Sequence, residues 1–184
     1  IHHLLGVNLL IFDYQGYGRS EGRPSERGTY RDARAALKYL HGRSDVDPER
    51  IVYFGRSLGA AVAVELATCH APQGMVLVAP FASLGDMARI IYRPLPLHWL
   101  VGNRYNSLDR IKHVNRPLLM FHGDQDSTIP ISQGIKLFAA AREPKQFHRL
   151  KGTGHNDTAS SGREDYWNTL VKFNNSLSNG HFDK

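Results

Sequence analysis

The sequence predicts an α/β domain in which a mostly parallel sheet is covered by helices on both faces. Short apolar runs that end at glycine or proline alternate with longer segments whose apolar residues recur every three or four positions. The short runs are nearly continuous, which is typical of strands buried on both faces of a parallel sheet. A length of 184 residues and a hydrophobic content of 41 % suit one domain covering residues 1–184.

Five short runs, bounded by turn-forming residues, are expected to form the strands. The first, VNLLIFDY, is a nearly continuous apolar run and is expected to be buried in the sheet. Loops rich in glycine, proline and aspartate follow the runs. The expected strands cover residues 7–14, 51–55, 74–79, 117–122 and 145–150.

Amphipathic segments between the strands are expected to form helices that pack on the sheet. The first of them has tyrosine, alanine and leucine side chains on one face, and Gly42 follows just beyond its end as a stop signal. The expected helices cover residues 29–40, 58–67, 131–142 and 163–177.

Residues 81–105 are different, because they are apolar, interrupted by prolines and longer than the usual connection between a strand and a helix. Arg93 and the prolines beside it argue against a membrane span. We expect a small cap of short helices over the strand ends. The alternative is a helix pair that simply covers the sheet.

Composition excludes several other functions. The formal net charge is +6, but lysine and arginine are scattered with no run of three, which favours a solvated basic surface over nucleic-acid binding. The single cysteine, Cys69, excludes an intrachain disulfide and is expected to be a small helix residue rather than a nucleophile. No C-x-x-C or H-E-x-x-H pattern suggests a metal, no cofactor is expected, and no membrane span is expected within the chain.

The stretch IVYFGRSLGAA, residues 51–61, joins a strand-like run to a helix start made of small residues, and Ser57 lies at the turn between them. Such a turn requires small residues two positions before and two after its apex, and Gly55 and Gly59 occupy these positions. The turn exposes the serine hydroxyl above the strand ends and aims the backbone N–H of Leu58 at the same space. Ser57 is therefore a candidate nucleophile and the Leu58 N–H a candidate oxyanion donor; the alternative is a merely structural turn.

A nucleophilic serine needs a base, and in a parallel sheet only residues just past the strand ends can reach it. This criterion excludes most of the ten histidines. His122 ends a strand directly before a glycine and is expected to be a packed structural residue. His155 lies in the glycine loop GTGHND, residues 152–157, and is the expected base, with an ordinary loop histidine as the alternative.

The acid is expected in the loop after an earlier strand, and HGDQDSTIP, residues 122–130, offers Asp124 and Asp126. Asp124 directly follows the glycine turn and is expected to hydrogen-bond loop amides. Asp126 lies further out, where it can hold the imidazole in one tautomer, and it is the favoured acid. The order Ser57, Asp126, His155 is the one expected when a nucleophile elbow precedes the acid and the base.

Five segments together resemble the α/β-hydrolase superfamily of serine hydrolases, and most closely its α/β-hydrolase-domain depalmitoylating proteins and their bacterial relatives. The resemblance implies the same roles for the serine, the acid and the base. It assigns Asp124 a structural role and places Asp13 and Gly16 in a structural loop. The segments are DYQGYGRSEG (13–22), GRSLG (55–59), PFASLGDMA (80–88), HGDQDSTIP (122–130) and GTGHND (152–157).

The front of the chain departs from that family. Members carry upstream strands and a His-Gly-Asn type loop that supplies a second oxyanion N–H, and nothing similar precedes Val7. The family's third strand also lies between the strands expected at residues 7–14 and 51–55. We therefore expect an N-terminally truncated part of an active enzyme, lacking the first strands. Expressed alone it is expected to be poorly folded and nearly inactive, since losing one oxyanion donor typically costs about 10²–10³ in rate.

The resemblance and the three candidate residues imply a serine hydrolase that transfers the acyl group of an ester or thioester to water. The apolar segment 81–101 favours a hydrophobic acyl chain. One alternative is a serine aminopeptidase, in which Asp86 or Glu65 would hold the substrate amine. The other is a non-catalytic binding module on the same scaffold, since a fold alone does not prove chemistry. The expected partner is an acylated or small-molecule substrate, and the expected location is cytoplasmic, or membrane-associated through residues before Ile1.

Overall fold

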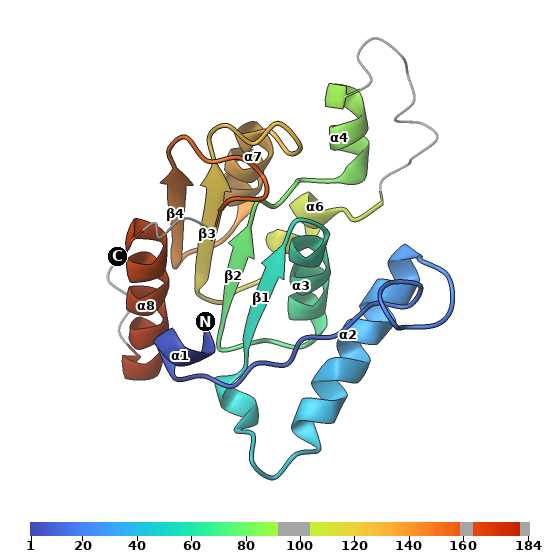
Figure 1. The fold of residues 1–184 in the computed structure, drawn as a ribbon, viewed down its shortest axis with the longest axis vertical. Helices are drawn as coiled ribbons and strands as arrows, with labels where there is room; N and C mark the ends of the chain where they lie inside the picture. Colours follow the sequence, from blue (N-terminus) through green and yellow to red (C-terminus); the bar gives the residue numbers. More distant parts are fainter. Residues whose placement is uncertain (92–103, 159–163, 181–184) are drawn as a thin grey trace.

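The computed structural model describes residues 1–91, 104–158 and 164–180, and these form a parallel sheet between two layers of helices (Figure 1). The strands lie side by side in the order in which they follow one another in the chain. Because every neighbouring pair is parallel, all carboxyl ends lie at one edge of the sheet. The strands are β1 (Val52–Arg56), β2 (Gly74–Val78), β3 (Leu118–Gly123) and β4 (Lys145–Leu150).

All the predicted helices are present, and short ones are added to them. The helix predicted at residues 29–40 begins earlier, at Glu26, because the Ser25 hydroxyl accepts the backbone N–H of Gly28 (3.1 Å) and so caps the first turn. None of the helices in the described ranges has the length and apolar character needed to cross a membrane. The helices are α1 (His2–Leu5), α2 (Glu26–His41), the 3₁₀ helix η1 (Pro48–Arg50), α3 (Leu58–Cys69), α4 (Leu84–Ile91), α6 (Ser107–Ile111), α7 (Ile131–Ala140) and α8 (Glu164–Asn179).

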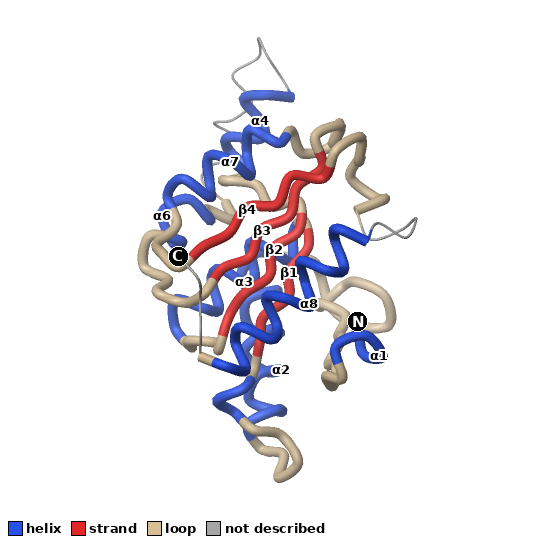
Figure 2. Tube along the Cα trace, turned by 90° about the vertical axis from the view of Figure 1, so that its left-hand side faces the viewer, coloured by secondary structure: helices blue, strands red, loops and turns tan. Residues whose placement is uncertain are grey.

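The two faces of the sheet pack against different helices, with α8 on one face and α3 on the other (Figure 2). Along β2, Met75 and Leu77 join a core with α2, α3, α6 and α7, whereas Val76 and Val78 join a core with α8. β3 alternates between the same two cores. Since both faces of these strands are buried, their sequences are continuously apolar.

The predicted cap at residues 81–105 is described only in part. Its beginning forms α4, which lies beyond the carboxyl ends of the strands in Figure 1. Residues 92–103 lie outside the described residues. The last turn of α4 exposes Ile90 and Ile91. Apolar side chains are therefore available at the same edge of the sheet as Ser57.

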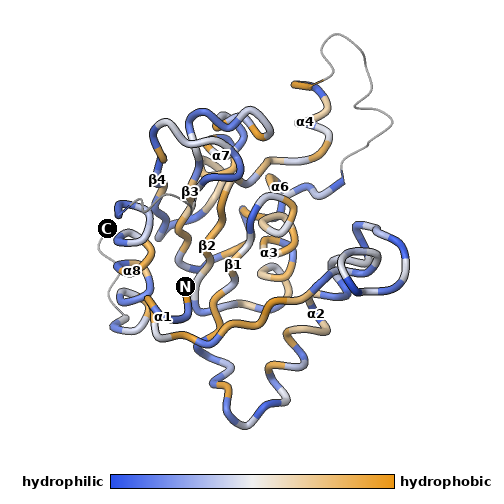
Figure 3. The backbone as a smooth tube through the Cα atoms, viewed as in Figure 1, coloured by the Kyte–Doolittle hydropathy of each residue, from blue (hydrophilic) through white to orange (hydrophobic). Residues whose placement is uncertain are grey.

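The strand predicted at residues 7–14 is wrong. Four of the five predicted strands are present within one residue of their expected bounds, but this segment is not a strand, and β1 pairs only with β2 in the described part of the chain. The segment is apolar and is drawn in orange between α1 and α2 in Figure 3. One of its residues, Ile11, is 86 % exposed. An apolar run forms a strand only where a neighbour satisfies its backbone hydrogen bonds, and none of the described strands lies beside it.

A hollow of about 1110 Å³ lies between this segment, β1 and α8. Its walls include residues 6–10, the β1 side chains Val52 and Phe54, and the α8 side chains Leu170 and Phe173. The outer edge of β1, which no described strand pairs with, borders the hollow. β1, which ends directly before Ser57, is therefore an edge strand in the described part of the sheet.

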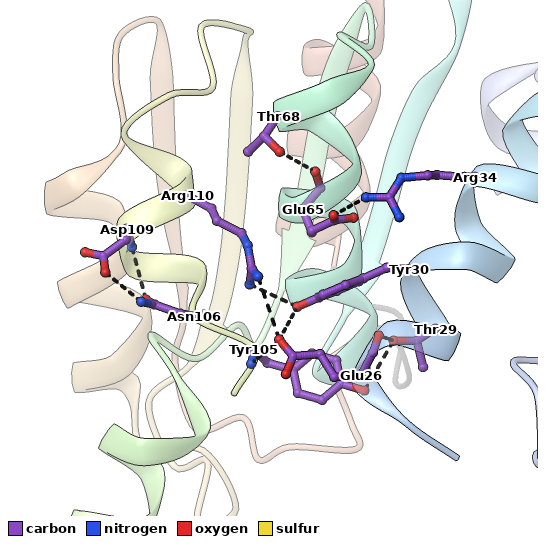
Figure 4. A network of polar contacts seen from close by, with 10 residues as sticks. All are labelled: Glu26, Thr29, Tyr30, Arg34, Glu65, Thr68, Tyr105, Asn106, Asp109 and Arg110. Atoms are coloured by element: carbon purple, nitrogen blue, oxygen red, sulfur yellow. Dashed lines mark hydrogen bonds and ion pairs between the residues drawn. The ribbon is translucent and has the colours of Figure 1, made fainter. Parts of the chain in front are cut away.

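A polar network joins α2 to α6 and the residues before it (Figure 4). The Tyr30 hydroxyl donates to Glu26 (2.8 Å) and accepts from Arg110 (2.9 Å). Glu26 also accepts the backbone N–H of Tyr105 (2.8 Å), whose hydroxyl lies 3.2 Å from that of Thr29. Burial and the hydrogen bond to Glu26 raise the pKa of Tyr30, so its hydroxyl keeps its proton and remains a donor. The network anchors the chain where it returns from residues 92–103.

Tyr30→Phe is expected to lower the free energy of unfolding of the full-length protein by about 1–3 kcal/mol, because Glu26 and Arg110 lose a shared partner. Tyr39→Phe is the matched control. The Tyr39 ring is exposed and its hydroxyl accepts one bond from Arg43, so we expect a change within about 0.5 kcal/mol. Urea unfolding followed by circular dichroism measures both changes. Equal effects would contradict the stabilising role of the network.

Candidate active site

Ser57 has the strained backbone of a nucleophile elbow. Its φ of 53° and ψ of −117° lie in a region that residues with a side chain rarely adopt. It stands between the last residue of β1 and the first residue of α3. Its N–H donates to the carbonyl of Val78 on β2 (2.9 Å), so the apex of the turn is tied to the neighbouring strand. The strand, sharp turn and helix predicted from the sequence are confirmed.

Gly55 allows β1 and α3 to approach each other at this turn. A Cβ added there would lie 2.4 Å from the carbonyl oxygen of Gly59 and 2.7 Å from the Cα of Ala60. Gly59 is different, because an added Cβ would meet only the Tyr14 hydroxyl, at 3.7 Å. The expectation that Gly59 must also be small is therefore wrong: its carbonyl faces the strand, and the space at its Cα is open.

The Leu58 N–H, the candidate oxyanion donor, belongs to the first turn of α3, where N–H groups have no partner within the helix. Among the described residues, no hydrogen bond joins Ser57 Oγ to His155. Catalytic hydrogen bonds of this kind often tighten only when a substrate binds. The roles of Ser57 and Leu58 in catalysis stay predictions.

Asp126 and His155 lie together, on the loops that follow β3 and β4. His155 Nδ1 is 2.7 Å from Asp126 Oδ2, and the side chain of Asp126 is 0 % exposed. The other carboxylate oxygen accepts the backbone N–H groups of Thr128 (2.9 Å) and Ile129 (2.7 Å). These donors replace the water lost on burial. A carboxylate only accepts hydrogen bonds, so Nδ1 carries the imidazole proton and Nε2 is left as an acceptor.

Asp124 has a different function in the same loop. One of its oxygens accepts the backbone N–H of Gly152 (2.7 Å), and the other accepts from Arg149 Nε (3.2 Å). It thus joins the loop after β3 to the end of β4, as expected for a structural residue. Asp124 and Asp126 are two positions apart in the chain but have different partners. Asp124 accepts a backbone N–H of the loop after β4, whereas Asp126 contacts the imidazole of His155.

His122 is a buried structural residue, as predicted. Its Nε2 is 2.8 Å from the carbonyl oxygen of Ile129, and the ring is 0 % exposed. Burial lowers the pKa of His122, which keeps the ring neutral, and Nε2 then carries the hydrogen donated to Ile129. Since Ile129 also donates to Asp126, the ring supports the segment that holds the acid.

Arg56 is a residue that the sequence reasoning missed. It is the last residue of β1, and its guanidinium donates to the carbonyl oxygen of His155 (2.5 Å) and to the side-chain oxygen of Asn156 (2.9 Å). The residue directly before Ser57 therefore contacts the loop that carries the candidate base. Nothing in the sequence pairs these positions, because 99 residues separate Arg56 from His155.

Comparison with known proteins identifies the family. Residues 19–175, which include all the candidate site residues, match the prolyl oligopeptidase family. The chain belongs to this family. An uncharacterized protein of Mycobacterium tuberculosis is 50 % identical over 155 residues, which cover 84 % of this chain and 55 % of that protein. Human alpha/beta hydrolase domain-containing protein 17B is 30 % identical over 169 residues, which cover 92 % of this chain and 57 % of that protein.

The fold of this family member is that of α/β-hydrolases, as the resemblance implied. An alpha/beta hydrolase from Penicillium sp. sh18 superposes with a TM-score of 0.71 at 19 % identity, covering 90 % of this chain and 78 % of that one. At such low identity the likeness concerns the fold alone. The chain spans little more than half the length of the two curated relatives.

The two carboxylates that would hold a substrate amine in an aminopeptidase, Glu65 and Asp86, are both paired with cations. Glu65 on α3 is nearly buried and forms an ion pair with Arg34. Asp86 on α4 forms ion pairs with Lys136 and Arg89. The charge of each carboxylate is therefore already balanced within the fold. Neither carboxylate therefore lacks a cationic partner that a substrate amine could supply.

No group of histidine, cysteine, aspartate and glutamate that could hold a metal ion occurs in the part of the chain that the structure describes. Cys69 is an exposed free thiol at the carboxyl end of α3. The candidate catalytic residues of this prolyl oligopeptidase family member stay those predicted from the sequence, Ser57, Asp126 and His155, and Arg56 contacts the loop that carries His155.

Gly55→Ala is expected to lower the free energy of unfolding of the full-length protein by about 1–3 kcal/mol or more, because the new methyl group collides with the backbone of α3. Gly59→Ala is the matched control, since the methyl group there meets open space, and we expect a small gain of up to about 1 kcal/mol from helix propensity. Chemical unfolding of the two variants gives the comparison. A Gly55→Ala protein as stable as Gly59→Ala would refute the close contact of β1 and α3.

Proposed function

We propose that the protein is a serine hydrolase that cleaves esters or thioesters of hydrophobic acyl groups through an acyl-enzyme. The observation that carries the proposal is the hydrogen bond of 2.7 Å between Asp126 Oδ2 and His155 Nδ1, on loops at the same edge of the sheet as the strained Ser57. A nucleophile, a base and an acid that orients the base are the groups that acyl transfer requires. Family membership supports the same reaction class.

In the first step, His155 Nε2 takes the proton of Ser57 while the hydroxyl oxygen attacks the acyl carbonyl. Asp126 holds the ring with Nδ1 protonated and stabilises the imidazolium that forms. The N–H of Leu58 stabilises the oxyanion, which develops on the carbonyl oxygen. The imidazolium then gives its proton to the leaving alcohol or thiol, and the acyl group remains on Ser57.

In the second step, water takes the place of the leaving group. His155 removes a proton from the water as its oxygen attacks the acyl-serine carbonyl, and the same proton returns to Ser57 when the acyl-enzyme breaks down. The products are a carboxylic acid and the regenerated serine. No cofactor takes part in either step.

The apolar substrate class is supported by the residues around the strand ends. α4 lies beyond the carboxyl ends of the strands (Figure 1), at the edge of the sheet where Ser57 follows β1. Its last turn exposes Ile90 and Ile91. A methylene group transferred from water to apolar surroundings gains about 0.8 kcal/mol. An acyl chain lying against such side chains would therefore contribute binding energy in proportion to its length.

A serine peptidase is the second candidate, and the match to the prolyl oligopeptidase family favours it. Against an aminopeptidase in particular stand the ion pairs of Glu65 with Arg34 and of Asp86 with Lys136. Each of these carboxylates already pairs with a cationic side chain of the protein, which takes the place that a substrate amine would need. The reaction of Ser57 with an amide would otherwise follow the same steps.

A substrate series separates the two candidates. For the full-length protein acting on nitrophenyl esters of increasing acyl length, we expect kcat/KM to rise by up to about fourfold per buried methylene. Aminoacyl nitroanilides are expected to react much more slowly. If the nitroanilides are the better substrates, the peptidase reading holds instead. Ser57→Ala is expected to abolish turnover of both kinds and labelling by a fluorophosphonate, whereas Ser176→Ala, whose hydroxyl bonds within α8, retains them.

The two aspartates give a matched test of the acid. Asp126→Asn is expected to lower kcat of the full-length protein by about 10³–10⁴-fold, because an amide in this position favours the wrong tautomer of His155. Asp124→Asn keeps an oxygen for the Gly152 N–H and is expected to change kcat by less than about tenfold. Steady-state ester hydrolysis measures both. A larger loss in Asp124→Asn than in Asp126→Asn would reverse the assignment of the acid.

A further inference from the structure

Arg56 connects the strand that ends at the candidate nucleophile with the loop that carries the candidate base. Its Nη2 atom donates to two acceptors on neighbouring residues, the carbonyl oxygen of His155 at 2.5 Å and Asn156 Oδ1 at 2.9 Å. The contact spans the sheet, because Arg56 ends β1 while His155 follows β4, at the opposite edge of the described strands.

We propose that Arg56 is a positioning residue, which holds the His155 loop against the elbow so that the imidazole stays within reach of Ser57. This inference rests on the function proposed above. Arg56 does not itself take part in the reaction. It acts through the backbone of His155 and through Asn156, and its position relative to the nucleophile is fixed because the two are neighbours in the chain.

The other contacts of this loop explain why such a residue is needed. Gly152 donates to Asp124, and Thr153 accepts from the backbone N–H of Gln125 (3.0 Å), so the start of the loop is held to the loop after β3. The hydrogen bond to Asp126 likewise orients the ring relative to that loop. These contacts fix the position of His155 relative to the acid, Asp126. The two hydrogen bonds from Arg56 fix the position of the same loop relative to the nucleophile, Ser57.

Arginine suits this task because of its geometry. The guanidinium is planar, rigid and always protonated, so it can donate to a carbonyl and a side-chain amide at fixed angles. Side chains of a strand alternate between its faces, so Arg56 lies on the same side of β1 as Val52 and Phe54, which is the side that faces α8.

The loss of these bonds is expected to affect the chemical step rather than substrate binding. An imidazole that moves by about 1 Å relative to the serine hydroxyl costs about 10²-fold in rate. For Arg56→Met in the full-length protein we therefore expect kcat, and the rate constant of fluorophosphonate labelling, to fall by about 10- to 100-fold with KM unchanged. The fall is expected to be the same for short and long acyl esters, because Arg56 is proposed to act through its bonds to His155 and Asn156.

Three variants complete the test. Arg43→Met removes an arginine that pairs with Asp45 at the surface and is expected to leave kcat unchanged. Arg56→Lys keeps the charge, but its ammonium group cannot occupy the position of Nη2 because the side chain differs in length and shape, so we expect only partial recovery. Asn156→Ala is expected to lower kcat by less than Arg56→Met, and to have a smaller effect when Arg56 is already Met, since the two share one contact.

Several outcomes would overturn the proposal. They are an unchanged kcat in Arg56→Met, a loss that appears in KM or varies with acyl length, full recovery in Arg56→Lys, and additive effects with Asn156→Ala. Thermal unfolding of each variant shows whether a loss of rate follows from a loss of stability, which would also count against it. Failure of the proposed function is distinguished by Ser57→Ala: if that variant keeps its activity, the nucleophile is wrong, whereas an inactive Ser57→Ala beside a fully active Arg56→Met rejects this inference alone.

Discussion

The left-handed backbone of Ser57 is the constraint on which the candidate site depends. It is maintained from both sides, because Gly55 lets α3 contact the end of β1 and the Ser57 N–H is bonded to Val78 on the next strand. The position of the hydroxyl is therefore set by packed backbone rather than by a choice of side-chain rotamer. Because the position of the nucleophile is fixed in this way, the positions of the acid and the base must be fixed by other parts of the fold.

The acid and the base reach the site as one unit. The loops after β3 and β4 contact each other closely: a Cβ on Gly123 would lie 2.2 Å from the carbonyl oxygen of Thr153. Backbone bonds run from Asp124 to Leu150 (3.1 Å) and from Gln125 to Thr153 (3.0 Å). The hydrogen bond between the two functional side chains thus lies between loops that are already joined. The distance between Asp126 and His155 is therefore set by contacts between these two loops and does not depend on β1.

Features that depend on residues close together in the sequence could be predicted, whereas features that depend on distant neighbours could not. The bounds of β2 and β3 could be predicted because each is a short apolar run that is buried on both faces. The elbow could be predicted because its requirements lie within a few positions of Ser57. Residues 7–14 have the same apolar character, yet composition does not show whether a neighbouring strand exists to pair with them. The expectation for Gly59 failed because spacing along the sequence does not show which atoms lie beside its Cα.

Arg56 shows how a local constraint carries over to a distant contact. Side chains of a strand alternate between its faces, so if Gly55 faces α3, the next residue must face α8 and the loop that follows β4. The strained turn then comes directly after it and fixes the direction in which β1 ends. The residue between the packed glycine and the nucleophile is therefore the one position of the elbow whose side chain is directed at the base's loop. The geometry at the end of β1 therefore does two things: it exposes the Ser57 hydroxyl, and it directs the Arg56 side chain toward the loop of His155.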